Sequence, residues 1–291
     1  MTDTDHTASS VASPQDEAAR SEAAAADRAL TRRMEAQLEL AEQTARVAQE
    51  LETAPPIEAR SHTALAVSVV IPCYNERETI VEIVRRVQMV GVHHEIIIVD
   101  DFSTDGTRDL LLLLDNEPDI RVLFHGYNRG KGAALRTGFS AADGEVVMIQ
   151  DADLEYNPND LPRLLAPIER GEADVVYGSR FLENAHQDPS RMHRFGNWLL
   201  TAASNAATGQ KLTDMETCYK VFRREVIERI NIEQKRFGFE PEITAKVSKL
   251  GYKILELPIG YDSRGYEEGK KIGWRDAVNA FYCIAKYGGR N

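Results

Sequence analysis

Acidic and polar side chains follow the ends of three apolar runs that have the length of buried strands. The first run continues into Pro72-Cys-Tyr-Asn-Glu76, the second into Asp100-Asp101, and the third into Asp151-Ala-Asp153. Two carboxylates one residue apart at a strand end can chelate a hard divalent cation through oxygen ligands. A cation there would neutralise a diphosphate and act as a Lewis acid on a leaving phosphate. The pattern predicts a metal site that serves phosphate chemistry.

These groups meet only if the apolar runs lie side by side in one sheet. Strands are predicted at 66–71, 95–100, 120–124, 145–150 and 173–177, with helices near 77–90, 105–115 and 131–142. Near-continuous apolar runs separated by helices indicate an α/β protein whose mostly parallel sheet is covered on both faces. Ligands of such sheets bind beyond the carboxyl ends of the strands, where the acidic residues lie.

The spacing of the elements becomes irregular after about residue 190. Helices are expected near 194–208, 239–250 and 274–287, and strands near 218–223 and 252–261. Pro55-Pro56 interrupts the chain before the first strand and is typical of a linker. We therefore expect an extension over 1–60 and a globular domain over 61–291.

Charge and composition limit the possible functions. The 291 residues include 35 Lys and Arg against 46 Asp and Glu, a net charge of −11. An acidic chain argues against a broad nucleic-acid surface, which would need a basic face. No apolar run is long enough to span a membrane, and the start resembles no signal peptide. Three distant cysteines form neither a metal motif nor a disulfide framework, so we expect a cytoplasmic protein.

The extension is rich in Ala and Glu and holds no glycine or aromatic residue. From about 15 to 53 it contains strong helix formers and no breaker. A thin apolar stripe runs through Leu30, Met34, Leu38, Ala41 and Ala45. The segment is interpreted as a solvated helix or disordered tail, or alternatively as a coiled coil that makes a homo-oligomer.

Two further segments leave alternatives open. The glycine-rich stretch 126–132 matches neither G-x-x-x-x-G-K-[ST] nor G-x-G-x-x-G, so Arg129 and Lys131 either reach a phosphate or form an exposed turn. Asp214 and Glu216 are candidates for a general base, which a hydroxyl acceptor would require, or they cap a secondary-structure element. If the acceptor is already an anion, Asp214→Asn should leave transfer largely intact.

Three ordered motifs carry a resemblance to a known family. Val70-Ile-Pro-Cys-Tyr-Asn-Glu76, Val99-Asp-Asp-Phe-Ser-Thr-Asp-Gly-Thr107 and Asp151-Ala-Asp-Leu-Glu155 resemble the family 2 glycosyltransferases of the GT-A fold. Over about 66–275 the chain is similar to the dolichol- and polyprenyl-phosphate sugar synthases. The resemblance implies a nucleotide-sugar donor, Mg²⁺ or Mn²⁺, and a polyprenyl-phosphate acceptor. It divides the domain into a nucleotide-sugar half (66–180) and an acceptor half (181–291).

The resemblance also implies roles for individual residues. Pro72, Tyr74, Asn75 and Glu76 would line the nucleoside pocket, with Asp100 and Asp101 continuing its wall and Lys131 near the phosphates. Asp151 and Asp153 would bind the metal, with Glu155, where the family commonly has Gln, as a third ligand. Catalytic roles would fall to Asp153, Arg180, Arg264 and Lys270, beside the candidate base Asp214 named above, although Lys271 could replace Lys270 because the family's R-x-x-G-x-S-K loop differs here.

The implied reaction is an inverting sugar transfer from a UDP- or GDP-sugar to a lipid phosphate. A second hypothesis is transfer to a soluble or cell-wall hydroxyl, and a third is a non-catalytic nucleotide-sugar binding protein. The acceptor lies in a bilayer, so we expect peripheral binding at the inner face of the plasma membrane or a membrane-protein partner. Trp274, Val278, Phe281, Tyr282 and Ala285 recur at helical spacing and either dock at the membrane interface or pack on the domain.

Overall fold

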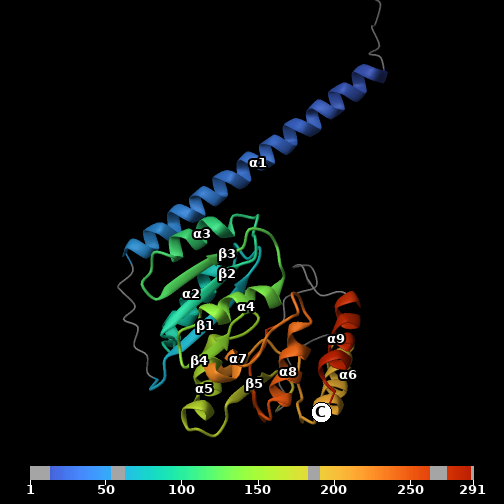
Figure 1. Cartoon of the computed structure of the whole chain (residues 1–291). Coiled ribbons are helices and arrows are strands. Elements are labelled where there is room, and N and C mark those ends of the chain that lie inside the picture. Colours follow the sequence, from blue (N-terminus) through green and yellow to red (C-terminus); the bar gives the residue numbers. More distant parts are fainter. Residues whose placement is uncertain (1–13, 54–62, 183–190, 263–273, 290–291) are drawn as a thin grey trace, which may run out of the picture. The chain divides into compact units, whose positions relative to one another are not determined.

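A sheet of seven strands organises the chain in the computed structural model, which describes residues 14–53, 63–182, 191–262 and 274–289 (Figure 1). The strands are β1 (Val67–Cys73), β2 (Glu95–Asp100), β3 (Ile120–Phe124), β4 (Val146–Ile149), β5 (Val175–Ser179), β6 (Lys220–Arg223) and β7 (Ile254–Pro258). Their order is β3-β2-β1-β4-β6-β5-β7. All neighbours run parallel except β6, which is antiparallel to β4 and to β5.

The helices connect the strands much as the sequence predicts. They are α2 (Ile80–Val90), α3 (Thr107–Leu114), α4 (Lys131–Ala141), η1 (Pro158–Asp160), α5 (Leu161–Glu169), α6 (Arg191–Thr208), α7 (Arg224–Glu228), α8 (Phe239–Lys249) and α9 (Trp274–Tyr287). The side chains of β4 and β5 are buried throughout, as expected for central strands covered on both faces. The predicted mostly parallel α/β fold is confirmed.

The strand order reverses between β1 and β4. The chain steps outward from β1 to β2 and β3, then returns through α4 to β4 on the other side of β1. Right-handed crossovers put α2 and α3 on one face of the sheet and α4 on the opposite face. Because the order reverses between β1 and β4, a ligand site is expected at their carboxyl ends.

The second half of the fold contains a reversal and a helix that the sequence analysis does not predict. Because β6 is antiparallel, its first residue, Lys220, lies opposite Tyr177 near the carboxyl end of β5. Residues 213–219, which precede β6, therefore approach the site. Helix α5 forms although Pro167 lies inside it. An interior proline removes a hydrogen bond and usually ends a helix, which hides α5 from sequence analysis.

The extension is a separate compact unit. The chain divides into Met1–Thr53 and Ala54–Asn291, and the first unit contains α1 (Pro14–Thr53), a helix of 40 residues. Leu30, Met34 and Leu38 of its apolar stripe are exposed by 55, 61 and 62 %. Among the described residues, no helix is long and apolar enough to cross a membrane.

Candidate functional site

Hydrogen bonds join the loops that follow β1 and β2 at the carboxyl edge of the sheet. The backbone N–H of Asn75 donates to Ser103 Oγ at 2.9 Å, and the N–H of Thr104 donates to Asn75 Oδ1 at 2.8 Å. Asn75 has a φ of 54°, a left-handed conformation that asparagine tolerates better than most residues. Tyr74, which precedes it, is 37 % exposed. Asn75 thus holds together the two loops at which the nucleoside pocket is predicted.

Asp100 and Asp101 lie buried beneath these loops. Asp100 accepts hydrogen bonds from the N–H groups of Phe102 and Ser103, both at 3.1 Å, and from Arg108 Nε at 2.6 Å. Asp101 binds His125 Nδ1 at 2.7 Å. It also accepts from the N–H groups of residues 129 and 130, at 2.8 and 2.6 Å. Both carboxylates position the loops, and a contact of either with a nucleoside stays a prediction.

Asp151 is paired with Lys131 beyond the carboxyl end of β4. The Lys131 ammonium lies 2.9 and 3.1 Å from the two carboxylate oxygens of Asp151, and 3.6 Å from Glu240 Oε1. Burial opposes both charges, but the attraction outweighs it, so the pKa of Asp151 is lowered and that of Lys131 is raised well above its usual value. Gly132 allows the backbone of residues 234–236 to approach the start of α4, because a Cβ there would lie 2.4 Å from the carbonyl oxygen of Gln234.

The three predicted metal ligands do not form one cluster. The N–H of Glu155 donates to Asp153 Oδ1 at 3.1 Å, whereas the Glu155 carboxylate accepts from the hydroxyl of Tyr261 at 2.8 Å. Across the described ranges, no three His, Cys, Asp or Glu side chains gather in a way that could hold a metal. The assignment of Glu155 as a third metal ligand beside Asp151 and Asp153 stays a prediction.

The donors at Asp151 and Asp153 nevertheless fit a divalent cation that shares its coordination with phosphates. Both offer the hard oxygen ligands that Mg²⁺ and Mn²⁺ prefer. In this structure, the cation held by both oxygens of Asp151 is the Lys131 ammonium, so the position already favours positive charge. Mg²⁺ commonly takes one or two carboxylates and completes its coordination with water and phosphate oxygens.

Arg180 follows β5 and forms a two-pronged ion pair with Asp214. Arg180 Nε and Nη2 donate to the two oxygens of Asp214 at 2.7 and 2.8 Å, and the Arg180 backbone N–H donates at 3.1 Å. Asp214 is fully buried. Burial alone would lower the pKa of Arg180, but Asp214 raises it well above the usual value. Arg180 donates to both oxygens, which suits a carboxylate that holds the arginine in place, and the role of Asp214 as a general base stays a prediction.

A chain of contacts connects Asp151 with Arg180. The Cys218 thiol lies beside Asp151, and the Cys218 N–H donates to the hydroxyl of Tyr156 at 3.1 Å. The ring of Tyr156 packs on that of Tyr261 with centroids 5.2 Å apart. The Arg180 guanidinium lies over the same Tyr261 ring at 5.1 Å. The acidic strand end and the arginine therefore belong to one site.

Sequence analysis did not identify all the charged groups at this site. Glu240 is 4 % exposed, and no described group makes a hydrogen bond to its Oε2. Burial, followed by repulsion from Glu240, raises the pKa of Glu216 to about 8. Burial likewise lowers the pKa of Lys220, whose ammonium donates to the Met215 carbonyl at 3.1 Å. The Phe-Glu-Pro-Glu run over 239–242 is the only sequence signal for Glu240.

Glu216→Gln is expected to stabilise the protein above pH 8 and to have little effect at pH 4. The folded pKa of Glu216, about 8, exceeds its ordinary value of 4.5, so folding favours the protonated form. The wild type therefore loses stability as pH rises from about 4.5 through 8, and the neutral amide avoids this loss. Thermal unfolding at both pH values measures the effect, with about 2–4 °C expected per kcal/mol. An equal change at both pH values would contradict the shifted pKa.

Arg264, Lys270 and Lys271 lie outside the described residues, so their predicted roles stay proposals.

Arg108 is a further charged residue that the sequence did not single out. Its guanidinium lies over the rings of Phe102 and Phe124, at 5.1 and 5.3 Å, and binds Asp100. These contacts depend on the pairing of β2 with β3, which sequence spacing alone does not reveal.

Comparison with known proteins agrees with this fold. Residues 68–230 match the family described as "Glycosyl transferase family 2". The chain is 32 % identical over 237 residues to polyprenol monophosphomannose synthase of Mycolicibacterium smegmatis, covering 76 % of this chain and 86 % of the relative. Dolichol-phosphate mannosyltransferase of Pyrococcus furiosus is 29 % identical over 72 % of this chain, which spans 60 % of that relative's length. An undecaprenyl-phosphate 4-deoxy-4-formamido-L-arabinose transferase of Yersinia enterocolitica is 29 % identical over 70 % of this chain, which spans 62 % of that relative.

Solved structures share the fold at lower sequence identity. Glucosyl-3-phosphoglycerate synthase from Mycobacterium tuberculosis, in complex with Mn²⁺, UDP and phosphoglyceric acid, has a TM-score of 0.62 and 20 % identity. The match covers 81 % of this chain and 82 % of that one. Another structure of that protein contains Mg²⁺ and UDP, with a TM-score of 0.61 and 21 % identity. These similarities support the fold assignment.

Proposed function

The chain belongs to glycosyl transferase family 2, and we propose that it transfers a sugar from a nucleotide diphosphate sugar to a polyprenyl phosphate, with inversion. One observation carries the proposal: Asp151 and Asp153 share a strand-end site with the buried Arg180–Asp214 ion pair. The names of three relatives, which refer to polyprenol, dolichol phosphate and undecaprenyl phosphate, support this acceptor class. The donor is proposed to be of the GDP-mannose or UDP-glucose type.

The donor is proposed to lie across the carboxyl ends of β1, β2 and β4. Its nucleoside contacts the loop of Pro72, Tyr74, Asn75 and Glu76, while Asp100 and Asp101 hold the adjoining loops. Asp151 and Asp153 would hold Mg²⁺ or Mn²⁺, and the ion would supply Lewis-acid charge for the diphosphate. Lys131 adds a fixed ammonium, already ionised by its pairing with Asp151.

The reaction brings two anions together, so the principal task of the site is charge stabilisation. A phosphate acceptor is already ionised and needs no general base. Arg180, held in place by Asp214, stabilises the negative charge that develops on the leaving diphosphate. Alignment of a phosphate oxygen behind the anomeric carbon produces inversion. Arg264 and Lys270 are proposed as additional cations for the acceptor.

A hydroxyl acceptor is the second candidate, and one observation favours it. Glu216, with a pKa of about 8, has the proton affinity of a general base that works near neutral pH. The original candidate base, Asp214, is instead bound by Arg180. A non-catalytic nucleotide-sugar binding protein is the third possibility, and the donor assay below distinguishes it.

The purified full chain should form a lipid-linked sugar when incubated with Mg²⁺, undecaprenyl phosphate and the correct member of a nucleotide-sugar panel. Mass spectrometry of the organic phase identifies the product and donor. Chelation with EDTA should abolish the product, and Mg²⁺ or Mn²⁺ should restore it. Product in the aqueous phase that requires a hydroxyl acceptor would support the second candidate instead. Donor binding without turnover on any acceptor would support the third.

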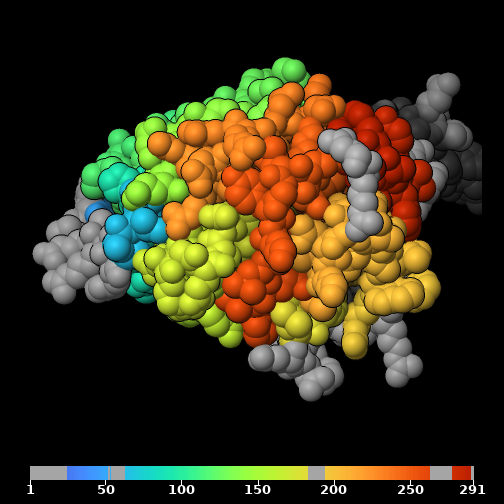
Figure 2. Space-filling view, turned by 60° about the horizontal axis from the view of Figure 1, so that its bottom comes forward, coloured from blue at the N-terminus to red at the C-terminus, as the bar shows by residue number. Residues whose placement is uncertain are grey.

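One face of the domain is proposed to rest on the inner surface of the plasma membrane. Helices α6 and α9 adjoin each other, shown in gold and red in Figure 2. Six large apolar side chains on them are exposed by 39–62 %: Phe195, Trp198, Leu199, Val278, Phe281 and Tyr282. Helix α6 has no acidic residue and carries the exposed Arg194, in a chain of net charge −11. Aromatic rings with neighbouring cations are typical of surfaces that bind anionic bilayers.

Phe195→Ser combined with Trp198→Ser is expected to weaken binding to anionic vesicles at least about tenfold, because two exposed rings no longer enter the interface. The matched control is Met89→Ser with Leu112→Ser, which removes side chains exposed by 69 and 56 % on α2 and α3. Vesicle sedimentation measures both. Equal losses in the two variants would contradict the assignment of this face.

A further inference from the structure

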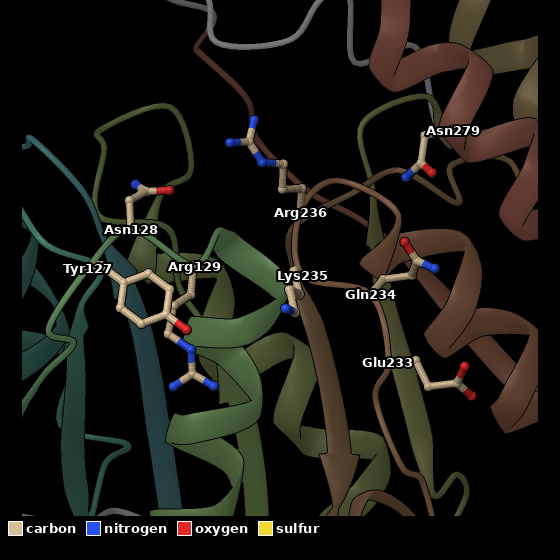
Figure 3. Close-up of a pocket in the computed structure, with 8 residues that line it drawn as sticks. All are labelled: Tyr127, Asn128, Arg129, Glu233, Gln234, Lys235, Arg236 and Asn279. Carbon is tan, nitrogen blue, oxygen red and sulfur yellow. The ribbon is translucent and has the colours of Figure 1, made fainter.

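A cavity lies beside the start of α4, where residues 127–129 precede Lys131. It has a volume of about 680 Å³. Figure 3 shows Tyr127 and Arg129 on one wall, residues 233–236 on the opposite wall, and Asn279 of α9 beyond them. The volume falls within the range of sites for small organic ligands.

The cavity concentrates positive charge in an acidic protein. Arg129, Lys235 and Arg236 line it, and no carboxylate of the described residues forms an ion pair with them. The one acidic lining residue, Glu233, already binds Lys246 at 3.0 Å and Lys286 at 2.9 Å. Lys286 is the principal cause that lowers the pKa of Glu233 to about 2, so the carboxylate is neutralised by its own partners. The cavity therefore presents a surplus of cations to a ligand.

Buried carboxylates hold both walls in place. Asp101 accepts the N–H groups of Arg129 and Gly130, as described above. The fully buried Glu242 accepts the N–H groups of Glu233 and Gln234 at 2.8 and 2.7 Å. The two walls are joined by a hydrogen bond of 3.2 Å from the Ala133 N–H to the Lys235 carbonyl. A site held in this way binds without first ordering its loops.

The position of Asn279 relates the cavity to the apolar face of α9. Tyr282 lies three residues further along α9, so the two side chains project about 60° apart around the helix. Tyr282 and Val278 are exposed by 57 and 59 %. A lipid whose anionic group occupies the cavity could therefore lay its apolar chain along α9. Lys131 pairs with Asp151 at the proposed donor site and does not line the cavity. The donor diphosphate and this second anion would therefore use different cations.

We propose that this cavity binds the phosphate of a lipid phosphate monoester, with Lys235, Arg236 and Arg129 as its cationic contacts. The inference rests on the proposed function in that a polyprenyl-phosphate acceptor has this chemistry. The headgroup of phosphatidic acid has the same chemistry, so the test has an arm for each source.

The test compares Lys235→Gln/Arg236→Gln with Lys249→Gln/Lys253→Gln in the full chain. All four side chains are exposed, and both variants lose two positive charges. Lys249 is the last residue of α8, and Lys253 follows it, whereas the cavity residues 233–236 precede the start of that helix. Binding is measured on phosphatidylcholine nanodiscs that contain either undecaprenyl phosphate or phosphatidic acid. Affinities for GDP and UDP are measured in parallel as a check on the donor site.

Lys235→Gln/Arg236→Gln should weaken binding to at least one phosphate-bearing nanodisc at least about tenfold relative to the control variant, with nucleotide affinities within about twofold of wild type. Weaker binding to nanodiscs with undecaprenyl phosphate identifies the cavity as the acceptor phosphate site. Weaker binding to nanodiscs with phosphatidic acid alone identifies it as a site for a lipid headgroup. Equal binding by both variants on both nanodiscs would overturn the proposal. Failure of the wild type to make a lipid-linked sugar would instead refute the proposed function, because the nanodisc comparison does not depend on turnover.

Discussion

Asp151→Asn is expected to lower the turnover number about 100- to 1,000-fold, the loss typical when one preorganised electrostatic group is removed from an active site. The carboxylate is proposed to hold the metal, and its two oxygens bind the Lys131 ammonium at 2.9 and 3.1 Å. The amide retains the size of the side chain but loses the charge. The pKa of Lys131 should consequently fall, because attraction to Asp151 is what opposes the effect of burial.

Steady-state kinetics at several Mg²⁺ concentrations test this expectation. The metal concentration for half-maximal activity should rise in Asp151→Asn, which separates a ligand defect from a general loss of folded protein. Asp143→Asn is the matched control, because the Asp143 side chain is 78 % exposed and its ion pair with Arg121 is long, at 3.8 Å. Unchanged turnover in Asp151→Asn would refute the proposed role of the strand-end carboxylates.

Asp214→Asn is expected to reduce both stability and turnover, contrary to the sequence-based expectation that transfer stays intact. Arg180 would remain largely buried without its carboxylate, and breaking a buried ion pair typically costs about 3–5 kcal/mol. The amide keeps one acceptor, so the loss in free energy of unfolding should lie near or below the lower end of that range. Turnover should fall because Arg180 is no longer fixed at the leaving diphosphate.

A double-mutant cycle with Arg180→Gln distinguishes this role from general-base catalysis. If Asp214 acts by holding Arg180, the double variant should lose less stability than the two single variants together, because no uncompensated charge remains. The control pair is Asp174–Arg223, 3.3 Å apart with side chains 47 and 27 % exposed, where exposed pairs contribute at most about 1 kcal/mol. A large loss of turnover in Asp214→Asn with unchanged stability would instead favour a base.

Local patterns explain why much of the fold could be predicted from the sequence. The apolar run of β2 and the acidic residues that follow it are adjacent in the chain, so they identify both a buried strand and its carboxyl end. Helix α4 begins at Lys131 and helix α9 spans Trp274–Tyr287, as the periodicity predicts. Helix α5 was missed because Pro167 is a local signal against a helix, and packing against β5 and β6 stabilises it.

The charged partners in the site depend on long-range pairing that local patterns do not contain. Lys131 meets Glu240 only because α8 begins beside the start of α4, and Glu155 turns to Tyr261 rather than to Asp151. Likewise, the spacing of Asp214 from Arg180 does not reveal their ion pair.

The sequence by itself determined the α/β class, the family and the acidic strand ends, because periodicity and motifs are properties of neighbouring residues. Only the tertiary structure decided that Asp214 binds Arg180 and that cations gather between residues 127–129 and 233–236. The direction of β6 decides the pairing of Asp214 with Arg180, since an antiparallel strand brings the residues before it to the carboxyl edge of its neighbours. Such pairings are set by the total burial and hydrogen bonding of the sheet, which no single segment encodes.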